Sequence, residues 1–273
     1  MSNDDRASRQ FEQTLSLAAP REAVWRALAE SGEVARWFAP EVEIEPRVGG
    51  TVRWEWPGHF DWRQTIEVFE PGRHLRTRYE AWSGDVSRPL FVDWQLEGEG
   101  GTTTLRVVHS GFGDDSTFDQ EYHDISNGWP VELASLRVYL ERHRGTPRQI
   151  TWARAMVDVD AGEAWQRLGA ADALGFAALP LRELEPGAPF AFASGDGERF
   201  AGTVVKAAEY EFAGPLETHD HGFLRLWLGG HEGRTMVWLW LATYGAAPPA
   251  GLQDRWDAMV RERLVEAQRD VTS

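Results

Sequence analysis

The sequence predicts an α+β fold that occurs twice along the chain, each copy combining antiparallel strands with a closing helix. Three observations lead to this prediction. Apolar and polar residues alternate with a period of two through most of the first half. A helical spacing then connects Phe118 to Leu140, and a similar order of segments begins again near residue 147.

The first half opens with a strand followed by helices. Apolar and polar residues alternate over residues 11–17, which is typical of a half-buried strand. Pro20 suits the first turn of a helix, and Gly32 is expected to separate this helix from a further short helical piece that carries Trp37 and Phe38.

The alternating segment that follows predicts a meander of hairpins. Turn residues punctuate it at Gly49-Gly50, at Pro71-Gly72 and over residues 98–101. The sequence has no strand–helix–strand rhythm and no phosphate-binding glycine motif, which argues against a nucleotide-binding sheet. Strands are expected over residues 41–45, 51–56, 65–69, 74–79, 90–96 and 103–109.

A long helix is expected to close the first half. Ser116 and Asp119 have the spacing of a capping box at its start. The apolar spacing continues through Gly128-Trp129-Pro130, so we expect the helix to be kinked there and not to end.

The second half repeats this plan. Ala164-Trp165-Gln166-Arg167-Leu168 mirrors Val24-Trp25-Arg26-Ala27-Leu28 at an offset of 140 residues. A closing helix is expected after Pro248-Pro249, with Trp256 in the place that Trp129 takes in the first copy. We therefore predict a flexible tail over residues 1–10, a first domain over 11–146 and a shorter, degenerate second domain over 147–273.

Composition excludes several classes of partner. The 273-residue chain has a formal net charge of −15, which repels nucleic acid and anionic membrane surfaces. It contains no cysteine, so it has neither disulfides nor thiolate ligands. Because no apolar run is long enough to span a membrane and residues 1–10 are polar, we expect a cytoplasmic protein.

Several marks in the first half appear in the order of a known family. They are Pro20, Val24-Trp25, Leu28, Trp37-Phe38, Gly49-Gly50, Glu70-Pro71-Gly72, Gly101-Thr102, Leu105, Gly128-Trp129, Leu133, Leu136 and Leu140. Over residues 11–144 the chain resembles the heat-shock-protein ATPase activator homologue (AHSA-like) branch of the SRPBCC superfamily, also called START-like or birch-pollen-allergen-like.

This resemblance implies a helix-grip fold, in which a curved antiparallel sheet wraps the long helix and leaves a cavity between them. The second half departs from the pattern. Gly175-Phe176 stands where the family has a Trp-Phe pair, and the paired glycines are reduced to Gly187. We therefore expect two tandem helix-grip domains, with the second structural or interface-forming.

A pocket between sheet and helix is the default location for a ligand in this architecture. Aromatic residues offer ring faces to an apolar or aromatic molecule, and their N–H and O–H groups orient its polar atoms. The alternative is that these residues only fill the core, as alternating aromatics on strands commonly do. The candidate ligand-binding residues are Trp54, Trp56, Tyr79, Trp94, His109, Tyr122 and Trp129.

The histidines offer weaker signals. His109 shares the inward face of its strand and would suit general acid–base chemistry, or be a core-edge histidine bonded to backbone. The stretch Glu217–His221 fits no established zinc spacing and is interpreted as a solvated loop. His123 and Asp119 are interpreted as a surface pair on the long helix. No catalytic residues, metal site or cofactor are predicted.

Three functions remain open from the sequence. The first is a non-catalytic module that binds a small apolar or aromatic molecule in the first domain. The second is an enzyme of the cyclase, dehydratase or hydrolase kind, with His109 and Tyr79 or Tyr122 moving protons in the same pocket. The third is a co-chaperone-like role with a protein partner, and a homodimer is left open.

Overall fold

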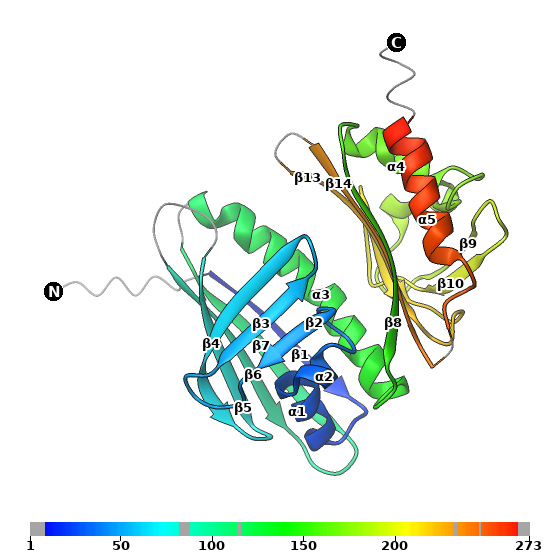
Figure 1. Ribbon diagram of the computed structural model, residues 1–273. Coiled ribbons are helices and arrows are strands. Elements are labelled where there is room, and N and C mark those ends of the chain that lie inside the picture. The colour runs from blue at the N-terminus through cyan, green and yellow to red at the C-terminus, as the bar shows by residue number, and fades with distance from the viewer. Residues whose placement is uncertain (1–8, 82–87, 114–115, 232–233, 246, 267–273) are drawn as a thin grey trace. The chain divides into compact units, whose positions relative to one another are not determined.

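The computed structural model describes residues 9–81, 88–113, 116–231, 234–245 and 247–266. The chain divides into two compact units, residues 1–145 and 146–273, called unit 1 and unit 2 below. Each unit combines an antiparallel sheet with a helix packed against it, so the chain is an α+β protein with two tandem helix-grip domains (Figure 1).

Unit 1 is built on a seven-stranded antiparallel sheet in the order β1-β7-β6-β5-β4-β3-β2. The predicted meander is confirmed, and the opening strand completes it by pairing with β7. The strands are β1 (Arg9–Leu17), β2 (Glu41–Ile44), β3 (Thr51–Trp56), β4 (Phe60–Glu70), β5 (His74–Glu80), β6 (Pro89–Glu97) and β7 (Thr103–Phe112).

The start of β1 shortens the predicted tail. Arg9 pairs with Phe112, so Arg9 and Gln10 belong to the sheet, while residues 1–8 of the expected tail lie outside the described residues.

The Gly49-Gly50 turn between β2 and β3 is confirmed, and it needs glycine. A Cβ at Gly50 would lie 2.1 Å from the carbonyl oxygen of Glu45, closer than any side chain allows.

The alternation of the sequence sets which side chains face inward. Along β6, Leu90, Val92, Trp94 and Leu96 are all buried on the face that lies toward the helix. At the sheet edge, β2 leaves Glu41 exposed, as expected of an edge strand kept soluble by charge.

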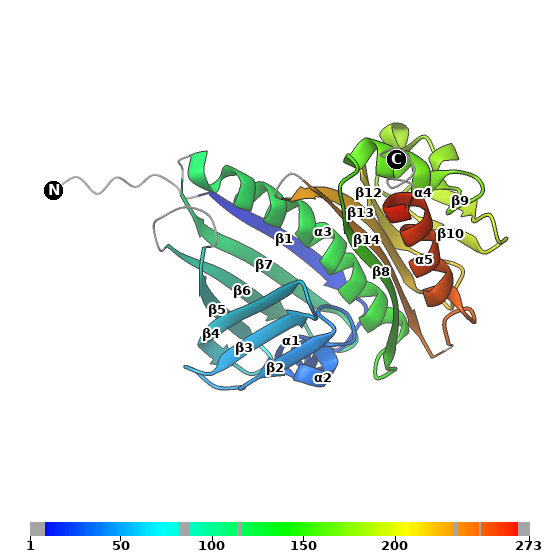
Figure 2. The same cartoon turned by 45° about the horizontal axis from the view of Figure 1, so that its top comes forward.

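The helices of unit 1 are α1 (Arg21–Ala29), α2 (Ser31–Val34) and α3 (Asp119–Arg142). Figure 2 shows α3 running along the sheet beside β1 and β7, with α1 and α2 at one end. Helix α3 continues through Pro130, as expected.

Three local predictions at the helix ends were wrong. Gly32 lies inside α2, and Glu30, with an extended backbone, separates the helices. Trp37 and Phe38 follow α2 in a turn instead of extending a helix. No capping box forms at the start of α3, because a 3₁₀ turn over Ser116–Phe118 leads into it and its N-cap, Phe118, has no side-chain oxygen.

Unit 2 has a five-stranded sheet in the order β11-β12-β13-β14-β8 and a separate β10-β9 pair. A bridge between Gly202 and Leu216 connects the pair to the larger sheet, so β10 and β11 form one interrupted strand beside β12. The strands are β8 (Arg148–Val157), β9 (Pro189–Ala193), β10 (Arg199–Thr203), β11 (Lys206–Ala208), β12 (Glu211–Pro215), β13 (Phe223–His231) and β14 (Arg234–Tyr244).

The connected strands reproduce the order of unit 1. Strand β8 pairs with β14 as β1 pairs with β7, and β13, β12, β10/β11 and β9 follow in the places of β6 to β3. Among the described residues, no strand of unit 2 takes the place of β2. Among the residues that the structure describes, the connected sheet of unit 2 is therefore narrower than that of unit 1 by one strand.

The helices of unit 2 also follow the repeat. Helix α4 (Ala161–Gly169) matches the bounds of α1 at the predicted offset of 140 residues. The closing helix α5 (Leu252–Val260) begins after the proline pair as expected and continues into a π-helical turn, Arg261–Glu266. Trp256 and Leu264 pack from this helix into the core of unit 2.

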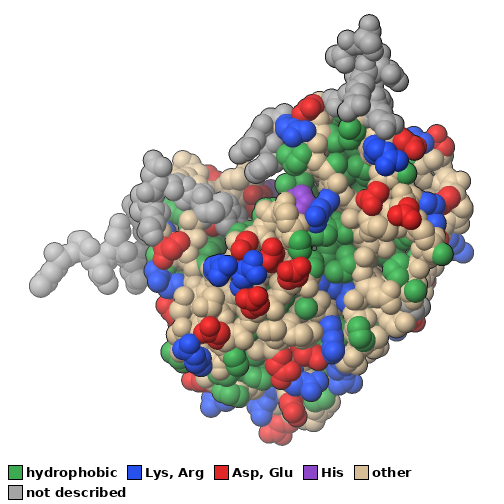
Figure 3. Space-filling view, viewed as in Figure 1, with side chains coloured by type: hydrophobic (Ala, Val, Ile, Leu, Met, Phe, Trp, Pro, Cys, Tyr) green, Lys and Arg blue, Asp and Glu red, His purple; other side chains and the backbone are tan. Residues whose placement is uncertain are grey.

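Charged residues of both signs are interspersed on the surface, as Figure 3 shows for one face of the molecule. Arg53 on β3 is an example, because its guanidinium donates two 3.0 Å hydrogen bonds to Asp61 and also pairs with Glu55. No helix among the described residues is both long and apolar enough to cross a membrane.

Candidate functional site

Six of the seven predicted site residues project from the sheet and helix of unit 1 toward one another. The indole rings of Trp54, Trp56, Trp94 and Trp129 are each less than a tenth exposed. They come from β3, β6 and α3, which lie far apart in the sequence, and only the pairing of the sheet brings them to one interior.

Ring contacts connect these residues across the interior. Trp94 meets Trp129 edge to face at a centroid distance of 5.2 Å, and Trp37 meets Trp94 in the same way at 6.4 Å. Phe38 then contacts Trp54 at 5.0 Å and Trp56 at 5.1 Å. The Trp37-Phe38 pair therefore joins the two groups of predicted tryptophans, a role that sequence reasoning did not assign to it.

His109 is the polar centre of this interior. Its imidazole is 4% exposed and lies between two hydrogen-bonding partners. The indole N–H of Trp129 donates to Nδ1 over 3.0 Å, and the hydroxyl of Tyr79 lies 2.9 Å from Nε2. The alternative of a histidine bonded to backbone is therefore not what the structure shows.

The Trp129 contact determines the tautomer of His109. An indole nitrogen can only donate, so Nδ1 of His109 must accept and carries no proton. Burial lowers the pKa of His109 to about 3, so the imidazole is neutral near pH 7. A neutral ring with a bare Nδ1 carries its proton on Nε2, which then donates to the oxygen of Tyr79.

Tyr79 consequently has its hydroxyl proton left to donate elsewhere. Burial raises the pKa of Tyr79, and the charge of Glu121 raises it further, so the phenol keeps its proton. Glu121 is fully buried on α3, and sequence reasoning missed it. Helical spacing could have predicted its burial. Glu121 lies four residues before Ile125 and eight before Trp129, on the inward face of the helix.

Tyr122 is the predicted residue that the structure places apart from this group. Its hydroxyl donates to the backbone oxygen of Gln10 over 3.3 Å at an exposed position. Its ring packs edge to face against Phe112 at 5.2 Å, and the guanidinium of Arg9 lies over the ring at 5.3 Å. Tyr122 therefore closes the edge of the interior with its ring.

Three further polar atoms are buried on the same inner face. Nε1 of Trp54, Oε1 of Gln64 and Oγ1 of Thr77 have no hydrogen-bonding partner among the described residues. Buried polar groups are normally paired, so these three atoms mark where a polar partner would be stabilised.

Two hollows among the described residues of unit 1 lie elsewhere. One of about 300 Å³ is lined by Ser31, Pro40 and Arg53, and one of about 480 Å³ by Trp25, Pro71 and Gly98. In the described part of unit 1, the predicted site residues line neither hollow.

The other histidine motifs differ from expectation. The expected pair between His123 and Asp119 does not form, because His123 bonds Asn127 over 2.9 Å and Asp119 pairs with Arg9. The Glu217–His221 stretch is not a fully solvated loop, because the side chain of His219 is only 4% exposed. No cluster of three metal-ligating side chains occurs among the described residues.

Comparison with known proteins places unit 1 in a family. Residues 18–141 match the family model described as activator of Hsp90 ATPase homolog 1-like protein (AHSA1). Unit 1 is an AHSA1-like domain. The match spans α1, the meander and nearly all of α3 in this AHSA1-like domain, and the predicted family is confirmed for these residues. The search of curated proteins gives no match.

Solved structures with similar chains match either about half of this chain or nearly all of it. The Aha1 dimer of Colwellia psychrerythraea is 19% identical, with 50% of this chain and 99% of that chain covered and a TM-score of 0.43. BexL, a di-domain ARO/CYC protein of the BE-7585A biosynthetic pathway, is 18% identical, with 96% and 95% covered and a TM-score of 0.44. DynU16, of the dynemicin biosynthetic locus, is 18% identical, with 96% and 98% covered and a TM-score of 0.42.

Proposed function

We propose that the AHSA1-like domain binds a small aromatic or apolar molecule against the inner face of its sheet, with the Tyr79 hydroxyl as a polar anchor. The Trp129–His109–Tyr79 chain of hydrogen bonds supports this proposal. Because Tyr79 accepts from His109, its own proton is directed away from the histidine. A carbonyl or ether oxygen on the molecule would accept that proton.

The surroundings of Tyr79 suit such a molecule. Indole and phenyl rings supply the apolar contacts, and they prefer the offset or edge-to-face arrangements seen among Trp94, Trp129 and Phe38. The unpaired atoms of Trp54 and Thr77 would hydrogen-bond to further polar atoms of the molecule. Binding requires the described side chains to separate, because they are in contact with one another in this structure.

A proton-transfer enzyme is the second candidate, favoured by the 2.9 Å contact between Tyr79 and His109. The histidine is a poor proton acceptor, however, because Nδ1 is occupied by Trp129 and burial lowers the pKa of His109 to about 3. Tyr79 is likewise a donor and not a base, because burial raises its pKa. The geometry therefore favours binding over catalysis, with Glu121 the remaining candidate base.

A co-chaperone role stays a prediction that rests on the description of the family. Titration of the protein against a cognate chaperone ATPase tests it, and unchanged ATPase activity would count against it. The described residues offer no contact that identifies such a partner.

The binding proposal is tested with two aromatic probes of similar shape, 2-acetylnaphthalene and 2-ethylnaphthalene, followed by quenching of tryptophan fluorescence. We expect tighter binding of the acetyl compound, because only its carbonyl accepts from Tyr79. Tyr79→Phe should remove that preference, weakening the acetyl compound by roughly fivefold, the worth of one hydrogen bond.

Tyr122→Phe is the matched control, because its hydroxyl bonds Gln10 at the surface and not the interior group. It should leave both affinities unchanged. Absence of binding by either probe, or a Tyr79→Phe protein that keeps the preference for the acetyl compound, would refute the proposal. Native mass spectrometry of protein from its host would then show which molecule, if any, co-purifies.

A further inference from the structure

Unit 2 has a hollow of about 500 Å³ at the end of its sheet where α5 begins. Glu198, Thr218, His219, Thr243 and Pro249 are among the residues that line it. The polar members come from the start of β10, the turn before β13 and the end of β14. Segments distant in the sequence therefore bring hydroxyl, imidazole and carboxylate groups to one place.

The turn that carries His219 has an unusual backbone. His219, Asp220 and His221 have φ angles of 56°, 53° and 56°, in the left-handed region that non-glycine residues seldom adopt. The amide of Gly222 closes the turn by donating to the oxygen of His219 over 3.1 Å. Unfavourable backbone of this kind persists where the surrounding structure holds it, and it is concentrated at binding and active sites.

The imidazole of His219 is fixed on three sides. Its ring stacks on Phe200 with a centroid distance of 4.9 Å and an interplanar angle of 7°. Nδ1 lies 2.9 Å from the hydroxyl of Thr218. Nε2 lies 3.2 Å from Oε1 of Glu198, but the direction is not that of a hydrogen bond. A molecule in the hollow would therefore find Nε2 available.

The neighbours of His219 also indicate its tautomer. A bare Nε2 would face the carboxylate of Glu198 with its lone pair, which is repulsive, so Nε2 carries the proton and Thr218 donates to Nδ1. Burial lowers the pKa of His219 more than Glu198 raises it, which keeps the ring neutral near pH 7. His219 thus presents an N–H donor beside a carboxylate acceptor.

Thr243 supplies the second observation. It lies on the inner face of β14, in step with Leu239 and Leu241, and is 2% exposed. Its Oγ1 has no hydrogen-bonding partner among the described residues. A buried hydroxyl is costly unless it is paired, so a molecule that pairs with Thr243 in the hollow would be bound favourably.

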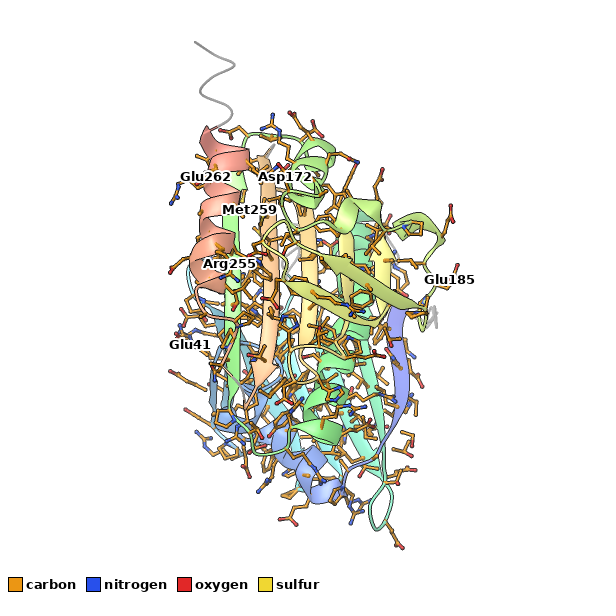
Figure 4. All side chains as sticks on the ribbon, turned by 90° about the vertical axis from the view of Figure 1, so that its right-hand side faces the viewer. Glu41, Asp172, Glu185, Arg255, Met259 and Glu262 are labelled. Atoms are coloured by element: carbon orange, nitrogen blue, oxygen red, sulfur yellow. The ribbon has the colours of Figure 1, made fainter. Side chains whose placement is uncertain are left out.

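The charges around the hollow offset one another. Arg255, near the start of α5, pairs with Asp196 over 2.5 Å and lies 3.9 Å from Glu198. Figure 4 shows Arg255 on α5 and Glu262 farther along, in the π-helical turn that follows this helix. Because the carboxylates already have a cation beside them, the site does not select strongly for an ionic ligand.

We propose that unit 2 binds a small, neutral molecule bearing several hydroxyl groups in this hollow. A hydroxyl accepts from Nε2 of His219 while donating to Glu198, and a second hydroxyl exchanges a hydrogen bond with Thr243. The hollow lies where β12 ends and β13 begins. The corresponding place in unit 1 is where β5 ends and β6 begins, which is the end of the sheet that carries Tyr79 and His109. It is independent of the aromatic site proposed for unit 1.

The test uses the full chain uniformly labelled with ¹⁵N, with myo-inositol as the probe and cyclohexanol as a probe of similar ring size and one hydroxyl. We expect myo-inositol to shift the Nε2 resonance of His219 and to leave that of His109 unchanged. Thr243→Val should weaken the apparent affinity roughly fivefold, as loss of one hydrogen bond predicts.

Thr235→Val is the matched control, because Thr235 is also buried and lies at the other end of β14. It should keep the wild-type affinity. His219→Asn is the second variant, because asparagine tolerates left-handed backbone. It should abolish the response to myo-inositol, which the amide signals of Thr218 and Thr243 report. This variant tests the proposal by itself if Thr243→Val does not fold. The proposal is overturned if myo-inositol leaves His219 unshifted, if cyclohexanol shifts it equally, or if neither variant weakens the response.

Discussion

At the scale of single residues, the protein uses buried histidines as neutral hydrogen-bonding groups. His109 accepts a hydrogen bond from the indole N–H of Trp129 and donates one to the hydroxyl oxygen of Tyr79. Its orientation is therefore determined by two residues that lie 20 and 30 positions away in the sequence. Period-two alternation predicted that His109 faces inward, but it contained no information on these partners.

The buried His109 should make stability depend on pH. Its pKa is lowered to about 3 in the folded protein, against 6.5 for an ordinary histidine. Between these values the unfolded chain binds a proton that the folded chain does not, so the free energy of unfolding falls as pH decreases from 6.5 toward 3. This stability is fully present above pH 6.5.

Urea unfolding at pH 7 and pH 4.5 checks this expectation. His109→Gln should show a smaller loss of stability between the two pH values than the wild type. His123→Gln, on the exposed side of α3, should retain the wild-type loss. Equal losses in all three proteins would show that His109 is not held neutral.

At the scale of elements, the second sheet depends on glycines where two strands approach closely. A Cβ at Gly202 would lie 2.1 Å from the oxygen of Pro215, and one at Gly214 would lie 2.0 Å from the oxygen of Thr203. The interrupted strand made of β10 and β11 turns between its two parts. These glycines let both parts still pair beside β12.

Gly202→Ala should therefore separate β10 from β12 and destabilise unit 2 by about 1–3 kcal/mol, the usual cost of overpacking. Gly230→Ala on β13 is the control, because a Cβ there meets nothing within 4 Å. It should leave stability within about 0.5 kcal/mol of the wild type. Thermal unfolding measures both, and an undisturbed Gly202→Ala protein would show that the close approach is not needed.

The same region marks where element prediction was incomplete. Strand β12 was not predicted, because its sequence of Glu211, Phe212, Ala213, Gly214 and Pro215 is poor in strand-forming residues. It forms because β13 pairs along its whole length, which supplies hydrogen bonds and burial that local sequence does not show. In unit 1 the strong alternation predicted every strand, but it missed residues 60–64 of β4 and misplaced several other strand ends by one to three residues.

At the scale of the whole molecule, each unit has its own core. Leu105 in unit 1 and Leu239 in unit 2 are both fully buried. Replacing either with alanine should cost about 2–5 kcal/mol, through lost transfer energy and a cavity. Calorimetry of the full chain should show that Leu105→Ala and Leu239→Ala lower the unfolding temperature of different parts of the profile.

Val48→Ala provides the control for these substitutions, because Val48 is 62% exposed. It should change stability by no more than about 0.5 kcal/mol. If Leu105→Ala and Leu239→Ala lowered one and the same transition equally, the two cores would not unfold as separate units.

The sequence by itself determined the order of strands and helices in unit 1, the repeat at 140 residues, the family of the first half and the inward face that carries Trp54, Trp94 and His109. These depend on local periodicity and spacing, which the chain carries along its length. Tertiary structure alone decided that Tyr79 and Trp129 bond the two nitrogens of His109, that Glu121 is buried, and that His219 and Thr243 line one hollow. Such contacts depend on strand pairing and helix placement between distant segments, and no local pattern specifies them.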